Sequence, residues 1–204
     1  DLSEVIYKEH QIITQNDFSN GLLFPDMAVS DADFNKELRR TKDQRIAKAI
    51  EIANADNEPH IVWVKLNDES KEVTAGIRGA VEVSGKDEPE DKAQKLLDFV
   101  DGKYRVLVTK PQIAKYGLNF QHCLHQTFMS PDFSFEGFYQ AVRRSHRFGK
   151  KGDVTVNIIT TDTMQNVMST IREKETQFKQ MQELMIKNQE ICKHLHSEPY
   201  TAIA

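Results

Sequence analysis

The sequence predicts an α/β protein with a doubly wound, mainly parallel sheet that is flanked by helices. Short apolar runs recur along the chain and alternate with charged, helix-like stretches, as expected for strands joined by crossover helices. Several of these runs are apolar throughout, which indicates that both faces of the sheet are covered. With 204 residues and a hydrophobic fraction of 39%, the chain is long enough to bury a sizeable core.

The first quarter of the chain is expected to hold a strand and a long helix. A segment with β-branched residues at both ends, 5–14, predicts the first strand. A turn-rich stretch, 16–30, follows and is expected to pack as a loop. Asp31 or Asp33 is placed to cap a single helix that runs to about Asn54. Helical spacing predicts that the buried side of this helix consists of Leu38, Ile46, Ala49, Ile50 and Ala53.

Strands and helices then alternate along the chain. The predicted strands are 61–66, 80–85, 104–110, 122–129 and 154–160. The helix predicted over 87–100 starts with acidic residues, which the helix dipole favours. We expect residues 1–162 to form one domain and residues 163–204 to form a C-terminal extension that is mostly one long polar helix.

Composition limits the classes of partner. The net charge is −4 at pH 7, so any contact with a polyanion must come from a local basic patch. The best candidate patch consists of Arg143, Arg144, Arg147, Lys150 and Lys151. Two cysteines far apart in the sequence indicate a reducing compartment. No apolar run approaches the length of a membrane span and no secretory signal is visible, so we expect a cytoplasmic protein without a membrane partner.

The stretch 140–150, QAVRRSHRFGK, is the most informative part of the chain. If this stretch is helical, Gln140, Arg144 and Arg147 fall within about 60° of one another around the helix axis. The opposite side carries an apolar stripe of Phe135, Phe138 and Val142. Guanidinium groups held in this way suit the charge that develops on a transferring phosphoryl group. The alternative is a solvated basic face of an amphipathic helix.

Three loops at predicted strand ends carry residues that suit phosphate. Ligands of parallel α/β sheets bind beyond the carboxyl ends of the strands. Backbone N–H groups and lysines at such places can hold phosphate oxygens. The residues concerned are Ser84, Gly85 and Lys86 in one loop, Thr109 and Lys110 in another, and Gly117, Leu118 and Asn119 shortly after.

Two segments, VLVTKPQIAKYGLNFQHC and SFEGFYQAVRRSHRFGKKGDVTVNIIT, together resemble motifs V and VI of superfamily-two helicases. Their sequences are most similar to those of the Snf-type DNA translocases, and particularly to those of bacterial and phage relatives. IVWVKLNDES stands where motif IV belongs and VEVSGKD where the next element belongs, so the resemblance covers about 5–187. It implies a RecA-like fold and a protein that works inside a bacterial cell.

The resemblance also implies a role in a two-lobed motor. In the family, ATP with Mg²⁺ lies between the lobes and is held mainly by the N-terminal lobe of the same parent chain, while the second lobe supplies arginine fingers. Arg144 and Arg147 match the fingers by position. Gln140 matches the residue that opens motif VI and faces the γ-phosphate. Gly117 and Asn119 match the part of motif V that lies between nucleotide and nucleic acid.

A second implication of the resemblance is contact with DNA through its backbone, with little sequence preference. The residues that match such contacts are Thr109, Lys110, Ser84, Gly85 and Lys86. Arg143 departs from the family pattern QxxGRxxR, where a glycine is usual, and either crowds the nucleotide or adds a contact to DNA or to an acidic partner. Lys150 lies beside the predicted fingers and is a further candidate for DNA contact.

The sequence contains no GxxxxGK[ST] P-loop, and neither of its two Asp-Glu pairs, at 68–69 and 87–88, is expected to act as the DExx motif that holds magnesium. We therefore expect the chain to be part of a longer ATP-dependent helicase or translocase and to be inactive as an ATPase by itself. Its first residue, Asp1, is also what we expect of a piece of a longer protein. Two alternatives stay open: a non-catalytic nucleic-acid-binding or regulatory module derived from a helicase lobe, and an unrelated phosphate-binding α/β domain.

No metal site is predicted. His122 and Cys123 would point to opposite faces of a strand, so they would not converge with His125 on one ion. A second group near the C-terminus offers only three candidate ligands, Cys192, His194 and His196. Trp63 is central in an apolar strand and is expected to belong to the core instead of forming a platform for base stacking.

Overall fold

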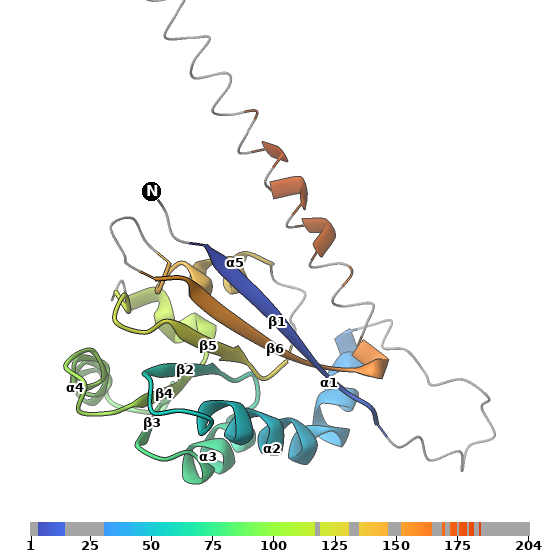
Figure 1. Cartoon of the computed structure of the whole chain (residues 1–204). Coiled ribbons are helices and arrows are strands. Elements are labelled where there is room, and N and C mark those ends of the chain that lie inside the picture. Colours follow the sequence, from blue (N-terminus) through green and yellow to red (C-terminus); the bar gives the residue numbers. More distant parts are fainter. Residues whose placement is uncertain are drawn as a thin grey trace, which may run out of the picture.

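A computed structural model describes the chain at residues 4–14, 31–116, 119–130, 135–146 and 152–164, and at separate positions between 169 and 184. Within these residues, six strands form one sheet in the order β1-β6-β5-β2-β4-β3, and each of the five pairings is parallel (Figure 1). The strands are β1 (Val5–Ile12), β2 (His60–Trp63), β3 (Ala80–Val83), β4 (Val106–Thr109), β5 (His125–Phe128) and β6 (Val154–Thr161). The predicted parallel α/β sheet is therefore confirmed.

Helices cover both faces of the sheet, as a doubly wound fold requires (Figure 1). One face packs on α2 (Lys42–Ala53) and α3 (Asn67–Gly76), and the other on α4 (Pro89–Val100) and α5 (Phe135–Val142). Alternate residues of β2 enter the two cores, because successive side chains of a strand point to opposite faces. Ile61 and Trp63 pack toward α4 and α5, whereas Val62 packs toward α2 and α3.

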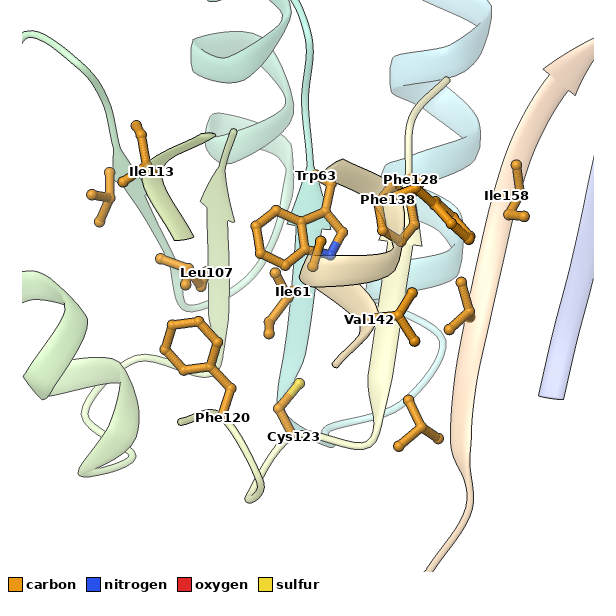
Figure 2. Packing of buried hydrophobic residues seen from close by; sticks show 14 of the residues in the cluster. Ile61, Trp63, Leu107, Ile113, Phe120, Cys123, Phe128, Phe138, Val142 and Ile158 are labelled. Carbon is orange, nitrogen blue, oxygen red and sulfur yellow. The ribbon is translucent and has the colours of Figure 1, made fainter. Parts of the chain in front are cut away.

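The larger core contains a group of aromatic side chains. Trp63 stacks on Phe128 at 5.9 Å between ring centroids, and Phe128 lies 4.6 Å from Phe138 of α5. Figure 2 shows these three side chains next to one another, between the strands and α5. Trp63 is only 2% exposed, so its predicted place in the core is confirmed.

The single helix predicted from Asp31 to about Asn54 is wrong, because the structure divides this segment into α1 (Asp31–Arg40) and α2 at Thr41. The Thr41 hydroxyl donates to the carbonyl of Glu37 at 2.8 Å. The guanidinium of buried Arg45 donates to that hydroxyl at 3.2 Å and to the carbonyl of Leu38. These side-chain bonds satisfy carbonyl groups at the end of α1, so the chain can leave the first helix without exposing unpaired acceptors to the core.

Among the described residues of the C-terminal extension, which are helical, Phe178 and Arg172 contact the domain. The ring of Phe178 lies 4.8 Å from Tyr139 and 5.7 Å from Phe135, both on α5. Arg172 forms an ion pair with Glu9 of β1. The extent of the predicted long helix, and the predicted loop at 16–30, lie outside the described residues. Where the structure is described, no helix is both long and apolar enough to cross a membrane.

Buried His60 is expected to make the stability of the domain depend on pH. Burial, and then the neighbouring His125, lower the pKa of His60 from 6.5 to about 3. Between these values the unfolded chain binds a proton that the folded chain does not, so stability falls as the pH is lowered from about 6.5 toward 3. The loss attributable to His60 is at most about 1.4 kcal/mol per pH unit.

Urea unfolding of the chain between pH 7 and pH 4 measures this effect. His60→Gln should make the pH dependence shallower, because the glutamine does not titrate. His122→Gln, at an exposed position, is the matched control and should leave the dependence as it is in the unsubstituted chain. An unchanged slope in His60→Gln would show that the buried imidazole is not its source.

Candidate functional site

A pocket of about 450 Å³ opens at the carboxyl ends of three neighbouring strands. Residues at or beyond the ends of β2, β4 and β5 form its walls, and α5 closes one side. The lining residues are Trp63, Val64, Lys65, Lys110, Pro111, Gln112, Phe128, Ser130, Glu136, Gly137, Phe138 and Gln140. The apolar members include the buried aromatic rings of Trp63, Phe128 and Phe138, and two lysines, two glutamines, a glutamate and a serine supply the polar side chains.

The strand connections explain why the pocket forms at this place. The chain leaves β2 through α3 on one face of the sheet and leaves β5 through α5 on the opposite face. Because β2 and β5 are paired neighbours, the connections diverge between them and leave a crevice at their carboxyl ends. Such a switch point is where ligands of open α/β sheets bind.

The α5 helix presents two polar side chains to this pocket. Gln140 is exposed, and its amide nitrogen donates to the carboxylate of Glu136 at 3.0 Å, one helical turn earlier. Phe138 and Val142 are buried on the other side of the helix, and Phe135 is partly buried, which confirms the predicted apolar stripe. Gln140 and Lys110, predicted from separate motifs, therefore line the same pocket.

The predicted continuation of this helix through Arg144 is wrong. The α5 helix ends at Val142, and Arg143, Arg144 and Ser145 form a turn. The amides of Arg144 and Ser145 donate to the carbonyls of Ala141 and Val142, three residues earlier instead of the four of an α-helix. The carbonyl of Val142 also accepts from the amide of His146. We call residues 143–146 the arginine turn.

The arginine side chains of the turn differ in their surroundings. Arg143 is exposed, and its guanidinium lies 5.7 Å from the ring centroid of Tyr139. Arg144 is half-buried, and its carbonyl accepts a hydrogen bond of 2.9 Å from the amide of Phe120. Phe120 belongs to the motif V segment, so the segments predicted as motifs V and VI are in direct contact.

The comparisons with known proteins agree with this arrangement. Residues 41–149, just over half of the chain, match the family model described as the helicase conserved C-terminal domain. This chain belongs to that family. No curated protein matches the helicase lobe.

Solved structures show the same fold. The C-terminal part of the Fun30 ATPase domain is similar to the helicase lobe, with a TM-score of 0.55 and 13% identity, over 69% of this chain and 52% of that chain. The C-terminal domain of the DEAD-box protein Dbp5 is similar with a TM-score of 0.54 and 14% identity, over 65% of this chain and 78% of that chain. The fold is therefore that of a RecA-like C-terminal helicase lobe. The chain spans about half the length of the Fun30 chain.

Thr109, Lys110 and the loop Ser84–Lys86, all predicted to contact nucleic acid, lie at the carboxyl ends of the neighbouring strands β4 and β3. Thr109 is 2% exposed, and its hydroxyl donates to the carbonyl of Val83 at 2.8 Å. Its side chain therefore joins β4 to β3 inside the sheet. Lys110, the next residue, is half-buried and lines the pocket, so in this conformation it is Lys110 that reaches the surface.

The loop after β3 is closed by bonds within itself. The amide of Ser84 donates to the Asp87 carboxylate at 3.0 Å, and the amide of Lys86 donates to the Ser84 hydroxyl at 3.2 Å. Partial burial raises the pKa of Asp87, but the Ser84 amide and the Lys95 ammonium outweigh this effect and lower it below its usual range. Two of the amides that we expected to face phosphate are thus engaged, whereas the side chain of Lys86 is exposed to solvent.

Three predicted site residues, Arg147, Lys150 and Gly117, lie outside the described residues. Asn119 is described and exposed, directly before the buried Phe120.

Sequence reasoning missed Lys65, Ser130 and Glu136 as members of the pocket. Lys65 was missed because the predicted strand extended to 66, whereas β2 ends at Trp63 and places Lys65 in the loop beyond the sheet. Glu136 accepts a hydrogen bond from Gln140. Lys65 could have been found from the sequence only if the strand had been predicted to end earlier. Lys65, Ser130 and Glu136 are brought together by the tertiary fold, which no local pattern reports.

Two loops at the pocket are joined by an ion pair below it. Arg45 and Glu69 are both 0% exposed and lie 3.0 Å apart. The Glu69 carboxylate accepts hydrogen bonds from the amides of Lys65 at 2.8 Å and Leu66 at 3.0 Å, and Arg45 donates to the carbonyl of Met129 at 3.1 Å. The pair therefore joins the loop after β2 to the end of β5.

Cys123 and His125, which were considered as metal ligands, contact other protein groups in the structure. Cys123 is buried, and its thiol donates to the carbonyls of Pro59 and His125. His125 stacks on His60 at 5.9 Å between ring centroids. Among the residues that the structure describes, no three histidine, cysteine, aspartate or glutamate side chains gather in a way that could hold a metal ion.

Proposed function

We propose that this helicase lobe is the second motor lobe of an ATP-dependent DNA helicase or translocase of the Snf type, acting in the cytoplasm of a bacterium or of a phage-infected cell. One observation carries the proposal: the pocket at the strand switch point is lined by Gln140 and Lys110, and the arginine turn follows directly on the helix that forms its wall. The amino-acid sequences of the motif V and VI segments support the Snf-type assignment. The Fun30 structure, described as part of an ATPase domain, has the same fold.

ATP would bind between this lobe and an N-terminal lobe of the parent chain. Arg144 and Arg147 would face the γ-phosphate and neutralise the charge that its oxygens gain during transfer. Gln140, held by Glu136, would orient toward the same phosphate. The chain contains no P-loop, so the N-terminal lobe would hold the remaining phosphates and Mg²⁺. When bound, Mg²⁺ neutralises phosphate charge during transfer.

DNA would be held through its phosphates at the carboxyl edge of the sheet. Lys110 and Lys86 present side chains at the ends of adjacent strands, β4 and β3. Arg143, exposed on the arginine turn, and Lys150 would add further phosphate contacts. Contacts to phosphates carry no sequence information, so binding would be insensitive to sequence and sensitive to salt.

The test is ATP hydrolysis by the whole natural protein that contains this lobe, measured against DNA concentration at several salt concentrations. We expect DNA to raise the turnover. Lys110→Ala should raise the DNA concentration that gives half-maximal stimulation and reduce the slope of log affinity against log salt by about 0.7 to 0.9, the loss of one phosphate contact.

Lys48→Ala, on α2 away from the strand ends, is the matched control and should leave the affinity for DNA and its salt slope unchanged. Turnover that does not respond to DNA would contradict the motor function. DNA binding without any turnover would favour the alternative, a nucleic-acid-binding or regulatory module that lacks catalysis.

A further inference from the structure

We propose that Gln126, a buried residue of β5, is the positioning residue that sets the place of the arginine turn, and so of the arginine that the turn presents to ATP. This inference rests on the proposed function, because the turn matters for catalysis only if its arginines reach the nucleotide. Gln126 belongs to none of the helicase motifs in which we predicted functional residues.

Gln126 bonds to the end of α5 and to the arginine turn. Its side chain is 0% exposed. The amide nitrogen donates to the Ser145 hydroxyl at 2.8 Å and lies 3.3 Å and 3.5 Å from the carbonyls of Val142 and Ala141. Both carbonyls lie in the last turn of α5 and also accept from the amides of Arg144 and Ser145, so the Gln126 amide is a further donor at the helix end. A side chain from the sheet therefore caps the helix where the arginine turn begins.

The orientation of the Gln126 amide is determined by Trp63. The indole N–H of Trp63 donates to the amide oxygen of Gln126 at 2.9 Å. An indole nitrogen can only donate, so the oxygen of the amide must face Trp63 and its NH₂ group must face α5. Trp63 is itself held by its stacking on Phe128 (Figure 2). Hydrogen bonds thus connect the arginine turn to β5 through Gln126 and to β2 through Trp63, and these two strands lie on either side of the switch point.

A second bond holds the turn from the other side. The amide of Phe120 donates to the carbonyl of Arg144 at 2.9 Å, and Phe120 is buried against Phe99 of α4 at 5.6 Å between ring centroids. The backbone of Arg144 therefore lies between an anchor from β5 and an anchor from the motif V segment. These bonds fix the position of the Arg144 backbone, and this position limits where its guanidinium can reach.

A glutamine at this position has no evident advantage for stability alone. A buried amide must satisfy its donors and its acceptor, and an apolar side chain of similar size would pack in the same space without that requirement. Here the oxygen and the nitrogen of Gln126 both have partners, and a fully satisfied buried network specifies one geometry. The side-chain amide of Gln126 therefore contributes the orientation of the arginine turn, which an apolar side chain would not provide.

The test compares Gln126→Met and Ser145→Ala with the unsubstituted whole protein in DNA-saturated ATP hydrolysis. Methionine has a similar shape and lacks the amide, so α5 should stay packed while its end loses the cap. We expect kcat to fall about 10- to 100-fold, as for a displaced catalytic group, and KM for ATP to change by less than about threefold. Combined with Arg144→Ala, Gln126→Met should cause no further loss, because it acts through the arginine turn.

Each other outcome overturns the inference. Gln126 does not position the turn if Gln126→Met leaves kcat unchanged or affects only KM for ATP. The same conclusion follows if the double variant with Arg144→Ala loses kcat by the full product of the two single losses. If Gln126→Met does not fold, Ser145→Ala, which removes a single oxygen atom, decides between the same outcomes. If Arg144→Ala itself is silent, the proposed function fails and the inference fails with it, whereas a loss in Arg144→Ala beside a silent Gln126→Met overturns the inference alone.

The bond to Trp63 can be tested in this chain alone, because Trp63 is its only tryptophan. An acceptor on the indole N–H stabilises the excited state, so Gln126→Met should move the fluorescence maximum to shorter wavelength. Ser145→Ala leaves that acceptor in place and should not move it. An unchanged maximum in Gln126→Met would show that the amide oxygen does not bond to the indole and would overturn the orientation argument.

Discussion

Replacement of Arg144 by alanine is expected to lower ATP turnover by the whole helicase about 10³- to 10⁵-fold, the usual contribution of an arginine finger. The physical reason is that the guanidinium neutralises charge that grows on the phosphate oxygens only in the transition state. ATP should therefore still bind, with an affinity close to that of the unsubstituted protein. The measurement is DNA-saturated steady-state hydrolysis together with ATP affinity at equilibrium.

Two further substitutions sharpen this experiment. Arg144→Lys keeps a positive charge but loses the planar fork that meets two oxygens at once, so its turnover should lie between those of the alanine variant and the unsubstituted protein. Arg78→Ala is the matched control: Arg78 precedes β3 at the opposite edge of the sheet and donates to the carbonyl of Asn54. Equal losses in Arg144→Ala and Arg78→Ala, or an Arg144→Ala loss that appears only in ATP affinity, would argue against a finger.

The largest effect on stability is expected from the buried ion pair of Arg45 and Glu69. Removing either partner leaves the other charge buried and unpaired, which costs about 3 to 5 kcal/mol of unfolding free energy. Arg45→Ala and Glu69→Ala should both show this loss in urea unfolding. Lys48→Ala, which breaks an exposed pair with Glu51 on the same helix, should cost less than about 1 kcal/mol.

The double variant Arg45→Met/Glu69→Leu separates the charge from the hydrogen bonds. In many proteins such an apolar pair is as stable as the ion pair it replaces. Here Glu69 also accepts from the amides of Lys65 and Leu66, and an apolar residue leaves both of these without that partner. We expect the double variant to stay less stable than the unsubstituted chain, and recovery of full stability would show that those amide bonds contribute little.

Much of the fold follows from patterns that are local in the sequence. The apolar runs predicted six strands, and each is present within the range expected apart from shifted ends. Helical spacing likewise predicted that Phe138 and Val142 are buried, because the period of a helix depends only on its own backbone. The family assignment rests on the same kind of signal, since the motif residues are close together in the chain.

The candidate site could be predicted only in part, because its walls come from three separate strands and a helix. Gln140 and Lys110 were expected to be functional, but the sequence does not say that they line one pocket. Lys65 joins them because β2 is shorter than its apolar pattern suggests. Thr109 has the residue type of a phosphate contact, yet the neighbouring strand β3 takes its hydroxyl.

The sequence by itself determined the class of fold, the helicase motifs and which helix faces are apolar, because these depend on residue type and spacing along one segment. The tertiary structure alone decided where helices end and which polar groups remain available. The first helix is broken at Thr41, where Arg45 bonds to its last turn, and α5 ends at Val142, where Gln126 reaches it from the sheet. Hydrogen bonds between residues far apart in the chain outweigh the small local preference for continuing a helix, and no local pattern reports them.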